Sequence, residues 1–314
     1  MINSVLCNLL DIKYPVLQGG MAWISDGKLA AAVSNGGGLG IIAAGNAPAN
    51  YVRQQIHLAK SLTEKPFAVN IMLLSPFADD VAQVVTDEEV AVVTTGAGNP
   101  SKYMESWNTA GVKVIPVVAS VAMAKLITRL GAIAVIAEGG ESGGHVGDLT
   151  TMTLVPQVCD ATELPVIAAG GIGDGRGIAA AFMLGACGVQ MGTRFLVAEE
   201  CSVHPNYKER ILKANDISTI VTGKRLGHPV RSLKTPFARE YIKAEFSDIS
   251  DEELEAMGTG ALRLAVQEGD LNNGCFLSGQ IAAMVKKEQP AADIIFEIIE
   301  EAEIVLKGVC KWVN

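Results

Sequence analysis

Short runs of apolar, mostly β-branched residues recur along the first two thirds of the chain, and most are followed by a stretch compatible with a helix. The runs are continuously apolar and do not alternate with polar residues, which is typical of parallel strands buried on both faces. The spacing between consecutive runs leaves room for one helix and two loops. Eight strands are predicted in this way: Pro15–Gln18, Leu39–Ala43, Phe67–Met72, Val90–Thr95, Val112–Val118, Ala132–Ala137, Pro165–Ala169 and Gly188–Met191.

The segments between these strands predict an α/β fold, specifically a (β/α)8 TIM barrel with its active site in the loops after the strand carboxyl ends. A doubly wound sheet is the alternative, but such a sheet usually has GxGxxG after its first strand. Here Gly19-Gly20-Met21 stands at that place, and GxGxxG occurs nowhere in the chain. The predicted helices are Lys28–Asn35, Ala47–Leu62, Phe77–Glu89, Val121–Leu130 and Gly175–Leu184.

The composition changes after the eighth predicted strand, where charged residues become more frequent. We interpret residues 204–274 as a mainly helical insertion that caps the barrel. Residues 1–203 would then form the TIM-barrel domain. Residues 275–314 would return to the barrel, with an acidic amphipathic helix at Ala291–Leu306.

Charge and composition exclude several classes of protein. The chain has 314 residues and a formal net charge of −9, which argues against nucleic acid as the main partner. Its apolar runs are shorter than the roughly 18 residues of a membrane-spanning helix. We expect no secretory leader and reduced cysteines, hence a cytoplasmic protein. No HxxxH, HExxH or carboxylate cluster is present, so no metal site is predicted.

Glycines gather after the last two predicted strands, in Gly170-Gly171-Ile172-Gly173 and in Met191-Gly192-Thr193. Glycine lets backbone N–H groups approach an anion closely, and the helix after the first loop would add its dipole. Many barrels hold a phosphate in these two loops. The pair therefore predicts a phosphate site, although either loop alone would be explained as a tight turn.

His145 lies in the glycine-rich loop Glu138–Gly147, after the sixth predicted strand. An imidazole with an ordinary pKa of about 6.5 can donate or accept a proton near neutral pH. We therefore predict a catalytic role for His145. His57 falls in a predicted outer helix, as a surface residue. His204 and His228 precede prolines, which favours turns, although His228 could also line a substrate cleft.

Two further strand ends carry candidate ligand contacts. Asn70 is a polar residue in an apolar strand, and a buried amide needs a hydrogen-bond partner. The small and flexible side chains of Gly20, Met21 and Ala22 follow the first strand. They could accept a flat ring system.

These motifs, taken together and in this order, resemble one family over essentially the whole chain. It is the family of FMN-dependent 2-nitropropane dioxygenase-like barrels, which includes nitronate monooxygenases and the flavin-type enoyl-acyl-carrier-protein reductase II. Three downstream segments resemble the reductase branch: His204–Lys208, Gly227–Arg231 and Ser278–Ala282. The segments that carry the wider resemblance are Gln18–Met21, Asn35–Gly40, the Asn70 strand, Glu138–Gly147, Ala168–Gly171 and Gln190–Arg194.

The resemblance implies FMN as cofactor, bound by the barrel of residues 1–203, and a substrate-binding role for the insertion of residues 204–274. It also assigns residues to the cofactor. Gly20, Met21 and Ala22 would contact the isoalloxazine, with Asn70 near its reactive edge. Glu138 and Ser142 would frame the ring and the ribityl chain. His145 matches the active-site histidine of the family. The FMN phosphate would be held by Gly170, Gly171, Met191, Gly192 and Thr193.

The reaction implied is reduction of the trans-2 double bond of an enoyl thioester on acyl carrier protein, with NADH or NADPH as hydride donor, in fatty acid elongation. His145 would donate or orient the proton for the α-carbon. The family's reductases are typically dimeric and stimulated by monovalent cations, so a homodimer and a possible cation are expected. A basic patch of Lys224, Arg225, Arg231 and Lys234 would face the acidic carrier protein, unless it is only a solvated surface.

Three alternative functions stay open, one of them a non-catalytic flavin- or ligand-binding regulator. A nitronate monooxygenase would use FMN and O2, with the same histidine as a base on a nitroalkane. A flavin-free barrel isomerase or lyase acting on a sugar phosphate would use the same phosphate loops. It would normally need Lys or a carboxylate at other strand ends, where this chain has apolar residues or glycine.

Overall fold

Eight parallel strands form a barrel in the computed structural model, which describes residues 2–312. The strand order around the barrel is β1-β9-β8-β6-β5-β4-β3-β2, and a bridge between Leu17 and Leu39 brings β1 back beside β2. The predicted TIM barrel is therefore confirmed. Its strands are β1 (Val16–Gln18), β2 (Gly40–Ala43), β3 (Phe67–Met72), β4 (Val92–Gly96), β5 (Lys113–Val118), β6 (Val135–Glu138), β8 (Val166–Ala169) and β9 (Gly188–Met191).

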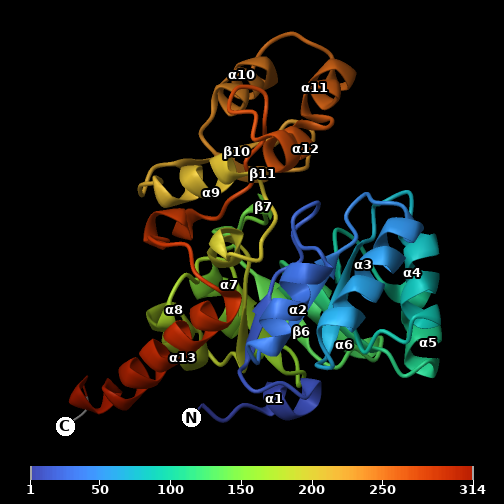
Figure 1. Ribbon diagram of the computed structural model, residues 1–314, viewed down its shortest axis with the longest axis vertical. Helices are drawn as coiled ribbons and strands as arrows, with labels where there is room; N and C mark the ends of the chain where they lie inside the picture. The colour runs from blue at the N-terminus through green and yellow to red at the C-terminus, as the bar shows by residue number, and fades with distance from the viewer. Residues whose placement is uncertain (1, 313–314) are drawn as a thin grey trace.

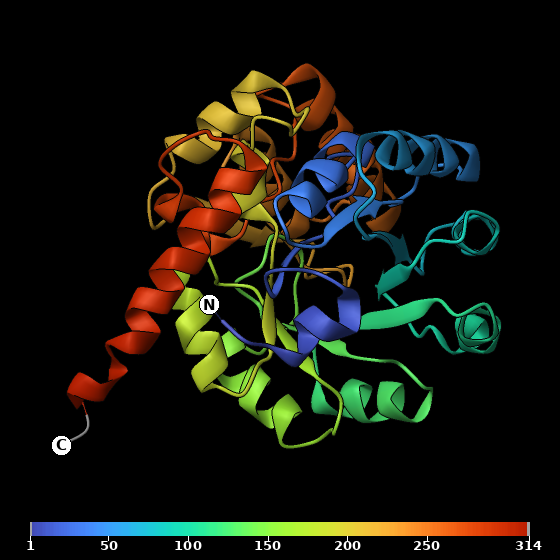
Figure 2. The same cartoon turned by 60° about the horizontal axis from the view of Figure 1, so that its bottom comes forward.

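Helices surround the strands, as Figure 2 shows from the end of the barrel at which α1 lies. The hydrophobic pattern predicts five of them and does not predict α1, α5 or α7. α5 buries only Met104 and Trp107, and α7 contains Pro156, so both patterns are weak. No helix within residues 2–312 is long and apolar enough to cross a membrane. The helices are α1 (Val5–Leu10), α2 (Gly27–Asn35), α3 (Ala49–Leu62), α4 (Ala78–Asp87), α5 (Ser101–Thr109), α6 (Val121–Arg129), α7 (Thr151–Cys159) and α8 (Gly175–Met183).

The core has two parts because successive side chains of a strand point to opposite faces. Leu17, Ile41 and Ile167 belong to the smaller cluster inside the barrel, which Leu6 and Leu10 of α1 join. The residues next to them in the strands, such as Val16 and Ile42, pack in the larger cluster together with the helices. Burial on both faces explains why the strands are continuously apolar.

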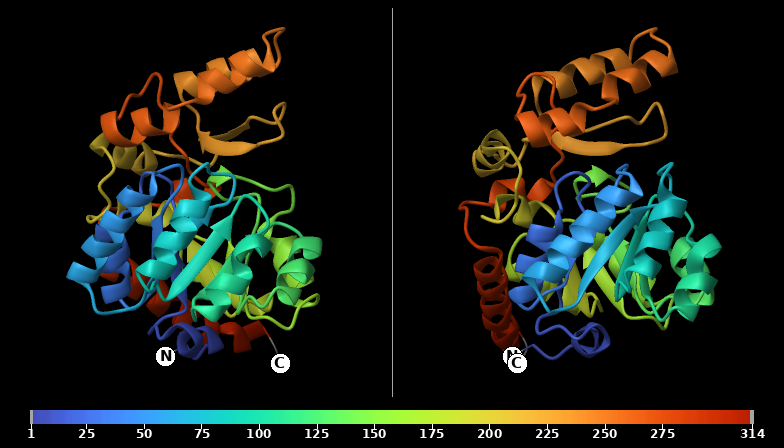
Figure 3. Two further views of the ribbon diagram at one scale, coloured as in Figure 1. Left: turned by 90° about the vertical axis from the view of Figure 1, so that its right-hand side faces the viewer. Right: turned by 45° about the vertical axis from the view of Figure 1, so that its right-hand side comes forward.

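The chain between β9 and α13 lies over the carboxyl ends of the strands (Figures 1 and 3). Its helices were expected, but an antiparallel hairpin of β10 (Thr219–Thr222) and β11 (Val230–Leu233) was not. β11 also pairs with β7 (Gly144–His145) from the barrel. The helical elements are a 3-10 helix (Thr193–Val197), α9 (Pro205–Leu212), α10 (Pro236–Glu245), α11 (Asp251–Gly258), α12 (Ala261–Arg263), a π-helix (Leu264–Glu268) and a second 3-10 helix (Gln280–Met284).

The long helix α13 (Ala291–Lys307) follows this segment and packs against α8 and α2 of the barrel. A short 3-10 helix (Val309–Trp312) comes after it. The predicted helix at Ala291–Leu306 is thus present and lies on the barrel. The division of the chain at residues 204 and 275 into functional domains stays a prediction.

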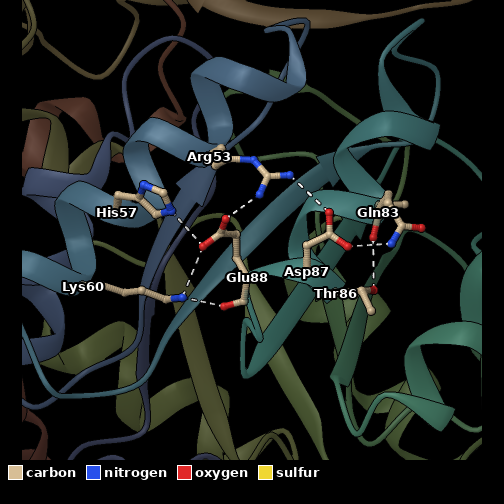
Figure 4. Close-up of polar contacts among 8 residues, drawn as sticks. Arg53, His57, Lys60, Gln83, Thr86, Asp87 and Glu88 are labelled. Atoms are coloured by element: carbon tan, nitrogen blue, oxygen red, sulfur yellow. Dashed lines mark hydrogen bonds and ion pairs between the residues drawn. The ribbon is translucent and has the colours of Figure 1, made fainter.

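A polar network joins α3 to the end of α4 on the outside of the barrel (Figure 4). The Glu88 carboxylate accepts from Arg53 Nη1 at 2.6 Å and is 2.9 Å from His57 Nε2. Lys60 Nζ donates to the Glu88 carbonyl at 2.6 Å. Burial opposes ionisation of Glu88, but His57 and Lys60 together lower its pKa. His57 is a surface residue, as predicted, because 59% of its side chain is exposed.

We expect Glu88→Gln to lower the free energy of unfolding at pH 7 by about 1 kcal/mol, the size usual for ion pairs near the surface. Because the folded-state pKa of Glu88 is lowered, this contribution is present above the unfolded value and is lost as the pH falls through the folded value. Urea unfolding at pH 7 and in acid measures the difference. Glu89→Gln, at an exposed neighbour, is the control. Equal losses for both variants would contradict the prediction.

Candidate active site

A cavity of about 250 Å³ opens at the carboxyl ends of the strands. Its wall is formed by the loops that follow β1, β2, β4, β6, β8 and β9, by Asn70 and Met72 within β3, and by the segment around Ser278. All twelve residues predicted from the sequence line this one cavity: Gly20, Met21, Ala22, Asn70, Glu138, Ser142, His145, Gly170, Gly171, Met191, Gly192 and Thr193.

A buried amide shapes the turn after β1. Gln18 Nε2 donates to Ser25 Oγ at 2.8 Å, and Gln18 Oε1 accepts from the Ile41 N–H at 3.1 Å. Ser25 Oγ in turn accepts from the Met21 N–H at 3.0 Å. These bonds fold the turn back on the barrel, so that Met21 lines the cavity.

Asn70 has the hydrogen-bond partner that its place in an apolar strand predicts. Its Nδ2 donates to Thr94 Oγ1 on the next strand at 3.0 Å. A Cβ at position 20 would lie only 2.5 Å from Asn70 Cβ, so Gly20 has to be glycine for the two to pack. Asn70 Oδ1 has no hydrogen-bond partner within the part of the chain that the structure describes.

The loops after β8 and β9 present backbone N–H groups to the cavity. Gly170 and Gly171 adopt left-handed φ angles of 87° and 71°, which side chains rarely tolerate. The N–H groups of Gly170, Gly171 and Gly192 donate to no acceptor among the described residues. Free N–H groups on glycines are suited to an anion.

The N–H groups in the first turn of α8 are not open to an anion, although the sequence predicts that this helix helps to bind a phosphate. Asp174 Oδ1 accepts from the N–H groups of Arg176 and Gly177, at 3.0 and 3.2 Å. Glu301 of α13 accepts from the Gly175 N–H at 2.8 Å. Two carboxylates therefore occupy the first turn of α8, and only the preceding glycine loop is left for an anion.

His145 stands at the mouth of the cavity on β7, where it is opposite Val230 of β11. Its side chain is exposed to solvent, yet the surrounding protein desolvates the ring enough to lower the pKa of the imidazole, and nearby His228 lowers it further. Both effects favour the neutral form of the imidazole. His228 does not line the cavity, and His204 caps α9 by accepting from the Asn206 N–H.

Glu138, at the end of β6, is the second proton-carrying group of the site. Burial raises the pKa of its carboxyl to about 7, and the Ser142 hydroxyl nearby moderates the rise. Ser142 Oγ is itself buried and does not reach hydrogen-bonding geometry with any described group. A carboxyl and a hydroxyl thus face the cavity with hydrogen-bonding capacity to spare.

The site also contains residues to which the sequence assigned no role. Glu141 accepts from Thr151 N–H at 2.9 Å and from Thr151 Oγ1 at 3.0 Å. Thr151 Oγ1 is also 2.9 Å from the Gly170 carbonyl, so Thr151 joins two cavity loops. The Gly279 N–H donates to Thr193 Oγ1 at 2.9 Å. In the sequence, only the family resemblance points to the segment Ser278–Ala282, because no local pattern shows that it returns to the cavity.

The sequence model of the nitronate monooxygenase family matches residues 3–88 and 75–301. The chain belongs to the nitronate monooxygenase family. Proteins of this family are flavin enzymes that use FMN. The predicted membership is therefore confirmed.

Three relatives show the range within the family. FabK from Thermotoga maritima is 50% identical over the full length of both chains, with a TM-score of 0.98. An octahydroindene-carboxyl-CoA dehydrogenase of Rhodococcus jostii is 39% identical over 74% of this chain and 66% of its own length, so the chain spans about two thirds of that protein. A probable nitronate monooxygenase of Staphylococcus saprophyticus is 31% identical over 97% of this chain and 99% of its own.

The cavity residues fit the FMN of this family. The free N–H groups of Gly171 and Gly192 suit a phosphate. Asn70 Oδ1 has no partner among the described residues, Ser142 Oγ has only the Glu138 carboxyl near it, and both residues line the cavity. Glycine at position 20 leaves the wall beside Asn70 without a side chain.

We expect the stability of the flavin-free protein to fall between pH 4.5 and pH 7 because of Glu138. Since its folded-state pKa of about 7 lies above the ordinary 4.5, its contribution is fully present below pH 4.5 and is lost as the pH rises through 7. The slope is at most about 1.4 kcal/mol per pH unit. Glu138→Gln should remove this slope in urea unfolding. Glu163→Gln, which changes an exposed acid, is the control and should keep the slope. If stability falls with pH equally in Glu138→Gln and in the parent, the slope does not come from Glu138.

Proposed function

We propose that this protein is an FMN-dependent enoyl-acyl-carrier-protein reductase that uses NADH or NADPH and acts in fatty acid elongation. The observation that carries the proposal is the similarity to FabK, the enoyl-acyl-carrier-protein reductase II, at 50% identity over the whole of both chains. The convergence of the predicted residues on one cavity supports it.

We assign the FMN contacts on the resemblance to the family, and the assignment is supported by the single cavity that all of these residues line. Gly20, Met21 and Ala22 would lie against the isoalloxazine, with Asn70 Oδ1 available near its edge. Glu138 and Ser142 would face the ring and the ribityl chain. When bound, FMN would supply the hydride transfer from the nicotinamide to the β-carbon of the enoyl thioester. The phosphate would be held by Gly170, Gly171, Met191, Gly192 and Thr193.

His145 is the group we assign to the proton at the α-carbon. It lines the cavity at its mouth, and its neutral ring offers one N–H donor. Pairing of β7 with β11 holds the backbone of His145, so the imidazole stays beside the cavity. A positioned donor of this kind contributes typically 10²–10⁴-fold to a rate.

The predicted basic patch is only partly available to a carrier protein. Arg225 donates to Asp251 Oδ1 at 2.9 Å and to two backbone carbonyls. Arg231 is half-buried and points to the glycine-rich loop. Lys224 and Lys234 remain exposed. We therefore base the carrier-protein substrate on the similarity to FabK and not on this patch.

Nitronate monooxygenase activity is the second candidate. The family match and the Staphylococcus saprophyticus relative favour it. His145 would then accept a proton from a nitroalkane, for which its neutral ring is also suited. The two functions differ in the second substrate and share the same cavity.

The two functions are separated by following flavin absorbance without oxygen. We expect NADH or NADPH to bleach the protein-bound FMN, and addition of crotonyl thioester to restore the colour. Loss of the restoration, together with oxygen-dependent turnover of a nitronate, would establish the monooxygenase instead. A protein that stays colourless after addition of FMN would exclude both.

We expect His145→Ala to keep FMN and its reduction by the nicotinamide, because the assigned flavin contacts lie elsewhere. The thioester-dependent step should fall by about 10²-fold or more, as expected for loss of a proton donor. Stopped-flow measurement of each half-reaction gives the two rates. His57→Ala, outside the cavity, serves as control. An unchanged thioester step would show that His145 does not supply the proton.

A further inference from the structure

Arg231 reaches from the cap hairpin to the loop that carries His145. Its Nη2 and Nε donate to the Gly140 carbonyl at 2.8 and 3.2 Å. Its third nitrogen, Nη1, is 3.4 Å from Thr219 Oγ1 on the neighbouring strand. Two donors of one guanidinium on a single carbonyl set the direction of the side chain as well as its distance.

The backbone of Arg231 contacts the same loop at a second point. Arg231 is opposite Gly144 in the β11–β7 ladder, one residue before His145. Its carbonyl accepts from the Ser278 N–H at 3.4 Å. One residue thus binds the loop at Gly140 and at Gly144, and also contacts the returning segment that completes the cavity wall.

The loop needs such support because glycines make up most of it. Gly139, Gly140, Gly143 and Gly144 lie between Glu138 and His145. Glycine loses more conformational freedom on ordering than any other residue, so an unsupported loop of this composition would sample many conformations. Larger residues cannot replace these glycines, since a Cβ at position 140 would lie 2.6 Å from the Gly147 carbonyl.

Charge gives Arg231 a further effect on the loop. The titratable residues that line the cavity are Glu138, Glu141 and His145, with no Lys or Arg among the described lining residues. Arg231 stands behind this lining and interacts electrostatically with Glu141. Glu141 in turn binds Thr151 beside the Gly170 loop. The guanidinium therefore offsets a carboxylate within the loop that it supports.

We propose that Arg231 is a positioning residue that holds the glycine-rich loop through Gly140 and Gly144, and so keeps His145 at the cavity mouth. The effect on the loop stands on the contacts alone. The effect on catalysis rests on the function proposed above. This role differs from the one that the sequence predicts for Arg231, which is to contact the acidic carrier protein as part of a basic patch.

The test compares Arg231→Ala and Arg231→Lys with the FMN-loaded parent. Arg239→Gln, at another arginine of the cap with an exposed side chain, is the control. Hydrogen exchange should rise in residues 139–147 of Arg231→Ala and stay unchanged in the barrel strands. Lysine can place one donor on the Gly140 carbonyl but not two, so Arg231→Lys should fall between Arg231→Ala and the parent.

Kinetics report the consequence for His145. We expect Arg231→Ala to lower kcat for the enoyl thioester by about 10- to 100-fold, the size usual for a misplaced catalytic group, with KM changed less than threefold. Reduction of FMN by the nicotinamide should keep its rate. Added guanidinium ion, at concentrations that leave the parent unaffected, should restore part of kcat in Arg231→Ala but not in His145→Ala.

Each outcome decides one part of the proposal. Unchanged exchange in residues 139–147 would overturn the positioning role, whatever the activity of the protein. Increased exchange with an unchanged kcat would overturn the link from the loop to His145. A kcat loss that guanidinium does not restore, with exchange raised across the whole protein, would show general destabilisation instead. If the parent reduces no enoyl thioester, the proposed function fails, and exchange in the loop still decides the positioning role.

Discussion

The parallel pairing of eight strands is the constraint on which the rest of the structure depends. Parallel strands that close into a barrel bring every carboxyl end to the same end of the molecule. Residues at or just after the carboxyl ends of all eight strands therefore meet around one cavity, although they lie far apart in the chain. The barrel closes between β1 and β2, where the contact is small: the Leu17–Leu39 bridge and a few backbone hydrogen bonds join the two strands.

Glycine residues let the backbone around the cavity approach a ligand closely, but they also make these loops less rigid. Gly170 gains support from Thr151, whose hydroxyl oxygen lies 2.9 Å from the Gly170 carbonyl. The loop before His145 gains its support from outside the barrel, through β11 and Arg231. The cap is therefore part of the site and not only a cover over it.

Anion binding in this cavity depends on backbone N–H groups and not on charged side chains. The titratable lining residues that the structure describes are two carboxyls and one histidine. Burial keeps Glu138 close to its midpoint near pH 7, which reduces the negative charge that a phosphate would meet. The same enclosure lowers the pKa of His145. One physical cause, poor solvation of the cavity, thus moves both groups toward their neutral forms.

The sequence by itself determined the barrel and the strand ends that carry candidate ligand contacts. Both follow from local patterns: buried strands are continuously apolar, and glycine, amide and imidazole residues stand where strands end. Tertiary structure decided which partner each polar group has. Glu301 accepts from the Gly175 N–H at the α8 N-terminus, Arg231 turns inward to Gly140, and β7 pairs with a hairpin that the pattern did not predict. Such pairings join residues up to 126 positions apart, so local periodicity carries no information about them.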